Sequence, residues 1–226
     1  MKSVSPPLAL VTGATSSIGR DLAGEFAAHD FHVVLVANDP TVHDVAADLP
    51  EATAIQLDLA VPANVDSLAA RVGVPTAMAI NADTTTGGSF SQGAALEDHL
   101  ATTDLNVRAT IHLTKRLLPG MIARAHGRLL FTSSGATNHP VHNATKAFVQ
   151  SFAGSLRDEL LGTGLTVTAL APESHSSTTL ASRVYAALMA GRPQVAPPSP
   201  LSRITSQIRI DQRLPAVLRF LTNARA

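Results

Sequence analysis

Short apolar runs alternate along this chain with longer amphipathic stretches. Buried strands are expected where almost every residue is apolar, at 8–13, 31–37, 53–59, 76–82, 127–134 and 165–172. Helical patterns separate these runs, at 18–28, 41–49, 63–71, 105–125 and 143–161, and another helix is expected around 185–190. Strands that are buried on both faces and joined through helices predict an α/β fold with a doubly wound parallel sheet.

The chain reads as a single domain followed by a tail. Its 226 residues are 45% hydrophobic, enough for one substantial core. We expect the domain to cover 1–191, and the Pro-rich stretch 192–200 to act as a hinge before a basic, amphipathic helical tail, 192–226, packed on the same domain. A membrane-surface helix is the alternative for this tail, but Pro215 interrupts the pattern and favours packing or a subunit contact.

Charge and composition narrow the classes of partner. Seventeen Lys and Arg balance seventeen Asp and Glu, so no overall field attracts nucleic acid or a membrane, and a small-molecule substrate is expected. The absence of Cys excludes disulfides, thiolate metal sites and a cysteine nucleophile. The nine histidines show no metal-ligand spacing, so no metal site is predicted. Without a signal-peptide core or a membrane-length apolar run, we expect a cytoplasmic protein.

The turn after the first strand has the composition of a nucleotide-binding loop. In "TGATSSIG" (12–19), glycine lets the backbone approach a pyrophosphate, which then lies on the unpaired amides of a helix N-terminus. Asp58, at the end of the third run, is placed to accept a hydrogen bond from an adenine amino group. Asn81 and Ala82 end the fourth run. Ligands of doubly wound sheets bind at these carboxyl ends of the strands.

The segments "TGATSSIG", "LDLA", "INAD", "DLNVRAT", "GRLLFTSS", "NATKAFVQSFAGSLRDEL" and "TVTALAP" together resemble the short-chain dehydrogenase/reductase family over almost the full length. The resemblance implies a Rossmann-like fold, NAD(P)(H)-dependent oxidation or reduction, and a homodimer or homotetramer. It also implies a catalytic tetrad, of which Asn106, Ser134 and Lys146 match. The cofactor residues that it implies are Thr12, Gly13, Thr15, Ser17, Ile18, Gly19, Asp58, Leu59, Asn81 and Ala82.

The fourth member of the family's tetrad is a Tyr, and this chain has His142 in its place. His142 and Lys146 are one helical turn apart, so they should face the same side. An imidazole titrates at about 6.5 and a phenol at about 10, so the substitution changes the proton chemistry. The alternative is a helix-start histidine left after activity was lost.

Three positions that face the cofactor in the family have gained side chains. Ser17, Asp83 and Glu173 stand where the family has Gly. A Cβ there obstructs the dinucleotide, and the two carboxylates add negative charge near an anionic ligand, so we expect NADP(H) binding to be weakened or lost. Ala37 and Asn38 lack the residues that would decide between NAD and NADP, and we favour NADP(H).

Three functions remain open from the sequence. The first is a non-redox acid–base enzyme that isomerises, eliminates or cyclises a carbonyl compound, using His142 with Lys146 and Ser134. Glu173 is included as a further acid–base candidate beside His175. The second is an NADP(H)-dependent ketoreductase with His142 as the proton donor. The third is a non-catalytic scaffold or binding protein.

Overall fold

The computed structural model describes residues 5–84, 89–133, 137, 139–170 and 178–195. The chain divides into two units, Met1–Val195 and Ala196–Ala226, and the second lies outside the described residues. The first unit therefore continues beyond the expected end at 191, because Gln194 and Val195 pair with the sheet. The packing of the tail on the domain stays a prediction.

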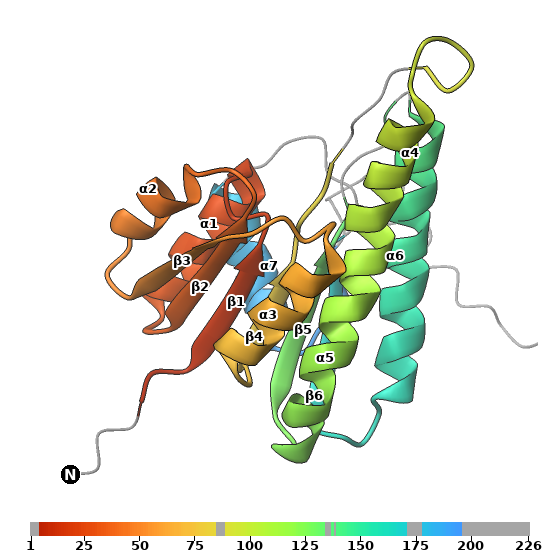
Figure 1. Ribbon diagram of the computed structural model, residues 1–226. Helices are drawn as coiled ribbons and strands as arrows, with labels where there is room; N and C mark the ends of the chain where they lie inside the picture. Colours follow the sequence, from red (N-terminus) through yellow and green to blue (C-terminus); the bar gives the residue numbers. More distant parts are fainter. Residues whose placement is uncertain (1–4, 85–88, 134–136, 138, 171–177, 196–226) are drawn as a thin grey trace, which may run out of the picture. The chain divides into compact units, whose positions relative to one another are not determined.

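The described residues form one parallel sheet of seven strands (Figure 1). Its order is β3-β2-β1-β4-β5-β6-β7, so the order reverses between β1 and β4. This reversal is the switch point at which doubly wound sheets bind ligands, and it confirms the predicted Rossmann-like α/β fold. The strands are β1 (Leu8–Thr12), β2 (His32–Ala37), β3 (Ala52–Gln56), β4 (Ala77–Ile80), β5 (Gly127–Thr132), β6 (Leu165–Leu170) and β7 (Gln194–Val195).

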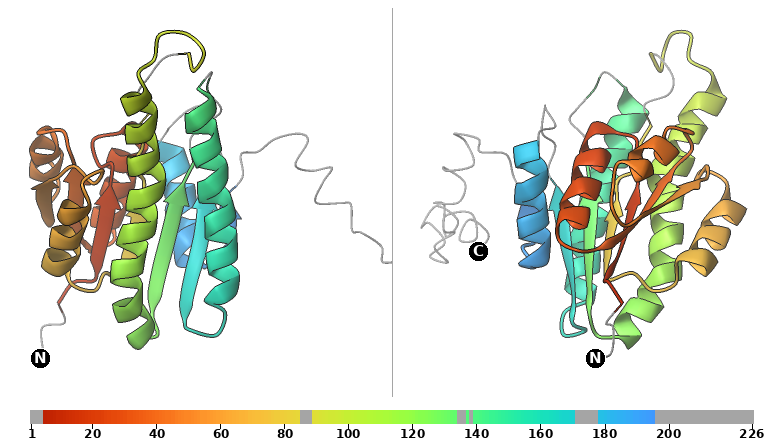
Figure 2. Two further views of the ribbon diagram at one scale, coloured as in Figure 1. Left: turned by 45° about the vertical axis from the view of Figure 1, so that its right-hand side comes forward. Right: turned by 90° about the vertical axis from the view of Figure 1, so that its left-hand side faces the viewer.

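Helices cover both faces of the sheet (Figure 2). One apolar cluster lies between the sheet and α1 and α7, and a second lies between the sheet and α3, α5 and α6. The near-continuous apolar character of β1, β2 and β4 follows from this double burial, whereas the edge strand β3, expected to be buried, fully buries only Ile55. The helices are α1 (Ser17–Ala28), α2 (Val42–Ala47), α3 (Pro62–Val72), α4 (Leu96–Thr103), the π-helical turn η1 (Asp104–Ala109), α5 (Thr110–Ala123), α6 (Pro140–Glu159) and α7 (Thr178–Met189).

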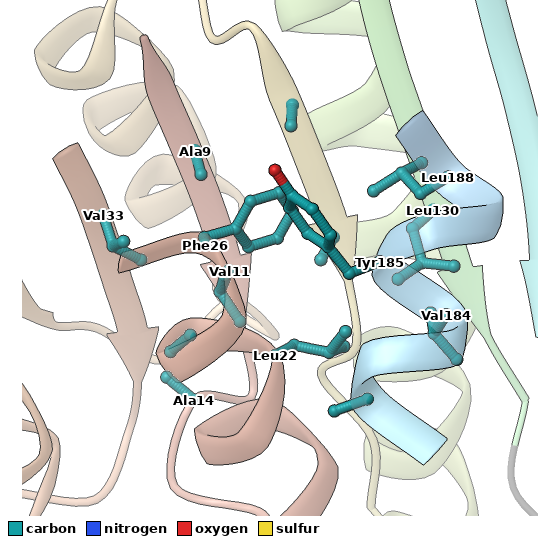
Figure 3. Close-up of a cluster of buried hydrophobic side chains, with 14 of the residues drawn as sticks. Ala9, Val11, Ala14, Leu22, Phe26, Val33, Leu130, Val184, Tyr185 and Leu188 are labelled. Carbon is teal, nitrogen blue, oxygen red and sulfur yellow. The ribbon is translucent and has the colours of Figure 1, made fainter. Parts of the chain in front are cut away.

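The cluster under α1 and α7 is built around aromatic rings (Figure 3). Phe26 is fully buried, and its ring meets the edges of Phe31 and Tyr185 at centroid distances of 5.2 and 5.5 Å. Such edge-to-face pairs stabilise a core beyond their buried area. Tyr185, the only tyrosine of the chain, is a core residue and not a substitute for a catalytic phenol.

The helix expected at 105–125 begins earlier than its pattern indicates. Helix α4 starts at Leu96 and runs through η1 into α5. Leu96 and Leu100 are exposed, so the first two turns bury no regular apolar stripe that a sequence pattern would reveal. Within the described part of the chain, no helix is both long enough and apolar enough to cross a membrane.

Candidate functional site

A cleft lies at the switch point of the sheet, beyond the carboxyl ends of β1, β2 and β4. Its empty space, counted together with the open solvent at its mouth, is about 520 Å³. Both apolar and polar residues line it, and those among the described residues are Gly13, Thr15, Ser16, Val36, Ala37, Asn38, Leu57, Asp58, Leu59, Asn81, Ala82, Asp83 and Leu105. The structure therefore places a ligand cleft where the sequence predicted nucleotide binding.

The glycines of the first turn are required by the chain itself. Gly13 has φ +61°, and a Cβ there would lie 2.7 Å from the carbonyl oxygen of Asn81. A Cβ on Gly19 would collide with the carbonyl oxygen of Gly13. These two positions hold β1, α1 and β4 close together, so their glycines are explained without a dinucleotide.

Asn81 joins three neighbouring strands and the first helix. Its side-chain amide donates to the Ser16 hydroxyl at 2.9 Å and to the Gly13 carbonyl at 3.2 Å, and its carbonyl accepts from the Thr132 hydroxyl at 2.7 Å. Ser16 also accepts from the Gly19 amide and so caps α1. Asn81 thus stabilises the wall of the cleft as well as lining it.

Asp58 marks the opposite end of the cleft. Its Oδ1 accepts a hydrogen bond from the Ala60 amide at 2.8 Å, which holds the carboxylate at the end of the turn after β3. Asn38 follows the neighbouring strand β2, and its carbonyl accepts a hydrogen bond from the Gln56 side chain at 3.1 Å. Val36 and Leu57 contribute apolar surface between them.

A carboxylate joins His142 and Lys146. Asp83, which follows β4, places Oδ2 at 3.2 Å from His142 Nε2 and Oδ1 at 2.7 Å from Lys146 Nζ. The side chains of His142 and Lys146 are 1% and 9% exposed, and that of Asp83 is 23% exposed. The predicted pairing of His142 and Lys146 on one face of α6 is therefore mediated by a residue 59 positions before His142.

The charge of Lys146 is set by two opposing effects. Burial lowers the pKa of its ammonium below the usual value, and the adjacent Asp83 carboxylate raises that pKa by charge and by hydrogen bonding. Burial is the larger effect, so the pKa is lowered overall. Asp83 is thus the counter-ion that favours the charged form of this buried side chain.

Asn106 forms hydrogen bonds with the backbone of Thr84, the residue after Asp83. Its amide accepts from the Thr84 amide at 3.1 Å and donates to the Thr84 carbonyl at 3.2 Å, in a two-way clamp. It also donates to the Thr145 hydroxyl at 3.0 Å. Thr84 follows Asp83 and Thr145 precedes Lys146, so Asn106 positions both members of the ion pair from inside the π-helical turn.

The second ring nitrogen of His142 faces a threonine. Its Nδ1 lies 3.3 Å from the Thr137 hydroxyl. The Asn143 amide holds Thr137 in place, because it accepts from the Thr137 amide at 2.9 Å and donates to the Thr137 carbonyl at 2.8 Å. Thr137 is therefore fastened to the first turn of α6, beside the imidazole.

The structure brings together only some of the predicted site residues. The catalytic candidates His142 and Lys146 both contact Asp83, Asn106 bonds to the residues next to this pair, and Ser134 and Glu173 lie outside the described residues. Six of the predicted cofactor residues line the cleft: Gly13, Thr15, Asp58, Leu59, Asn81 and Ala82. Four do not line it and lie in the wall or helix behind: Thr12, Ser17, Ile18 and Gly19.

The sequence analysis missed the roles of Asp83 and Thr137. Asp83 was noted as a charge that repels a cofactor, whereas the structure pairs it with a cation. Its position after a buried strand was a usable signal, because the carboxyl ends of parallel strands meet at one edge. Thr137 carried no signal, since loop threonines are common and its partner is a ring nitrogen on the next helix.

Comparison with known proteins agrees with the fold. A family model for the short chain dehydrogenase matches residues 7–187. The chain is 32% identical over 170 residues to the uncharacterized short-chain type dehydrogenase/reductase y4eK of Sinorhizobium fredii, covering 73% of this chain and 68% of that protein. It is 29% identical over 176 residues to the NADP-dependent 3-hydroxy acid dehydrogenase YdfG of Escherichia coli, covering 73% and 71% of the two chains.

Solved structures show the same likeness. The L-sorbose reductase of Gluconobacter frateurii, complexed with NADPH and L-sorbose, is 29% identical and superposes with a TM-score of 0.66 over 74% of this chain and 69% of that one. A short-chain dehydrogenase from Streptomyces avermitilis, at 23% identity, covers 96% of both chains with a TM-score of 0.77 and supports the fold. This chain belongs to the short-chain dehydrogenase/reductase family, whose named relatives are oxidoreductases.

Proposed function

We propose that this member of the family is an acid–base enzyme that moves protons on a carbonyl-bearing small molecule, with His142 as the group that takes and returns the proton. The observation that carries the proposal is the contact of Asp83 with His142 Nε2 at 3.2 Å in a nearly closed environment. A carboxylate on one ring nitrogen fixes the tautomer and orientation of an imidazole and stabilises its charged form, as in other acid–base sites.

The contact with Asp83 also determines which ring nitrogen of His142 is able to accept a proton. A carboxylate accepts a hydrogen bond, so Nε2 carries the hydrogen and the lone pair of the neutral ring is on Nδ1. Nδ1 faces the Thr137 hydroxyl at 3.3 Å. A substrate reaches this nitrogen either by displacing that hydroxyl or by passing its proton through it.

The substrate class follows from chemistry and from the relatives. An imidazole base removes a proton from carbon next to a carbonyl, and the same imidazole returns it to another atom, which isomerises the substrate without net oxidation. Elimination and cyclisation use the same proton transfers. The named relatives act on a hydroxy acid and a ketose, so 3-oxo acids and ketoses are the substrate classes to test first.

Proton exchange tests this proposal directly. We would incubate the protein with a panel of 3-oxo acids and ketoses in deuterated water and follow deuterium entry next to the carbonyl by NMR. His142→Gln should slow exchange by about 100-fold or more, whereas His126→Gln, at an exposed histidine outside the cleft, should leave it unchanged. Equal exchange in both variants would refute the role of His142.

A second candidate is an NADP(H)-dependent ketoreductase that uses His142 as the proton donor. The retained cleft at the switch point favours it, as do relatives named for NADP-dependent activity. It predicts oxidation of NADPH when ketones are added, and no deuterium exchange without the cofactor. If neither exchange nor NADPH oxidation occurs over the panel, the non-catalytic binding function is favoured.

We propose the remaining properties on the same basis. The protein acts in the cytoplasm on a small molecule, and it assembles as a homodimer or homotetramer through the helices that contain Asn106 and Lys146. NADP(H) binding is weakened relative to the family. Light scattering tests the assembly, and the binding experiment below tests the cofactor.

A further inference from the structure

The cleft has two chemically different ends. At one end, Asp58 and Asn38 lie near the apolar side chains of Val36 and Leu57, a combination that suits the flat ring and amino group of adenine. On the other side of the cleft, Asp83 follows β4 and belongs to the lining, and its carboxylate contacts His142 and Lys146. The Asp83 carboxylate therefore lies between the cleft and the two basic side chains.

The Asp83 end is firmly held. The carboxylate contacts Lys146 Nζ at 2.7 Å and His142 Nε2 at 3.2 Å. The Asn106 amide clamps the backbone of Thr84, the next residue, through both its donor and its acceptor. To move Asp83 aside, a ligand would have to break an ion pair whose ammonium is 9% exposed and leave that ammonium without its counter-ion.

A dinucleotide fits this arrangement poorly. Its second ribose continues past the phosphates, and Asp83 lies on that side of the cleft with its charge already committed to Lys146. A nucleotide that ends at its 5′-phosphates does not have to extend past Asp83, because the turn of Gly13, Thr15 and Ser16 follows β1, which lies between β2 and β4.

We infer that this cleft binds an adenine nucleotide that ends at its 5′-phosphates, and that Asp83 makes it discriminate against an intact nicotinamide dinucleotide. The discrimination goes beyond the proposed proton transfer, because it concerns the ligand of the cleft and not the reaction at His142. Asp83 is a specificity-determining residue in this inference.

Calorimetry tests the inference with ADP, NADPH and NADH as probes. The native chain should bind ADP at least as tightly as either dinucleotide. Asp83→Gly should raise the affinity for NADPH by about 10-fold or more, equivalent to about 1.4 kcal/mol, and change the affinity for ADP by less than about 2-fold. Asp83→Asn separates charge from volume, because it removes the charge and keeps the size. Asp158→Asn, an exposed carboxylate at the far end of α6, serves as the control.

The outcomes of these binding measurements distinguish the inference from its alternatives. Binding of NADPH about 10-fold tighter than ADP by the native chain, or no detectable binding of ADP, would overturn the inference. So would an unchanged ratio of the two affinities in Asp83→Gly, provided that circular dichroism shows the variant to be folded. Loss of proton exchange in His142→Gln together with absent ADP binding would refute this inference and leave the proposed function standing.

Discussion

The ion pair between Asp83 and Lys146 makes a quantitative prediction about stability. Asp83→Asn keeps the volume of the side chain and removes its charge. It leaves Lys146, whose side chain is 9% exposed, without its counter-ion. We therefore expect the free energy of unfolding to fall, because a buried ammonium that loses its partner keeps the full cost of leaving water.

The size of this loss follows from the distance and the exposure. Opposite charges 2.7 Å apart attract by about 6 kcal/mol at an effective dielectric constant of about 20, and desolvation offsets much of this. Removing one partner of a fully buried pair costs about 3–5 kcal/mol. The Asp83 side chain is 23% exposed, so water can approach Lys146 in the variant, and we expect about 2 kcal/mol.

A double-mutant cycle measures the pairwise part of this energy. Urea unfolding at neutral pH would be followed by circular dichroism for Asp83→Asn, Lys146→Met and the double variant, with an expected coupling of about 1–3 kcal/mol. The control is the exposed pair of Asp104 and Arg108, 3.0 Å apart, where coupling should stay below about 0.5 kcal/mol. Equal coupling in the two cycles would refute the argument that burial makes the Asp83 pair strong.

Three further predictions concern the turn, the core and the buried lysine. Gly19→Ala should prevent folding or cost more than about 3 kcal/mol, whereas Gly24→Ala in the same helix, whose Cβ meets nothing within 4 Å, should stabilise by about 0.5–1 kcal/mol in urea unfolding. Phe26→Ala should cost about 3–5 kcal/mol, measured in the same way. Acylation followed by mass spectrometry should show Lys146 deprotonating at lower pH than the exposed Lys115, and at still lower pH in Asp83→Asn. Because folding lowers the pKa of Lys146, the unfolded chain binds this proton more tightly than the folded chain does. The free energy of unfolding is therefore higher above the unfolded pKa of about 10.4, and this gain is lost as the pH falls through the folded pKa.

The parts of the fold that were predictable are those whose burial is periodic. The strand around Leu10 and the helix around Phe26 are visible in the sequence because nearly every inward position is apolar. Helix α4 was not predicted, since Leu96 and Leu100 lie on its exposed side and the helix depends on its continuation into η1 and α5. Strand β7 has only two residues, too few for a pattern, and only its pairing with β6 defines it.

The candidate site was predictable within one helix but not between elements. His142 and Lys146 share a face of α6 because a helical turn separates them, and spacing alone showed this. The sign of the Asp83 interaction required the fold. A carboxylate after β4 can repel a phosphate or neutralise an ammonium, depending on which group is nearer. The 2.7 Å contact with Lys146 shows that Asp83 neutralises an ammonium. The catalytic role of Asn106 stays a prediction, and the hydrogen bonds of its amide with Thr84 and Thr145 could not be predicted from the sequence.

The carboxylate of Asp83 therefore explains two differences from the expected redox site, one at Lys146 and one at His142. Burial disfavours the charged form of Lys146, and Asp83 supplies an anion that favours this form from the protein itself. The same carboxylate orients His142, so a proton taken up by the imidazole would draw on a counter-ion that the ammonium already uses. Proton transfer at His142 and the charge of Lys146 are then coupled through Asp83, and replacing Asp83 should change both. In the binding inference made above, an intact dinucleotide would have to displace Asp83 from Lys146, at a cost that an adenine nucleotide without the second ribose does not incur.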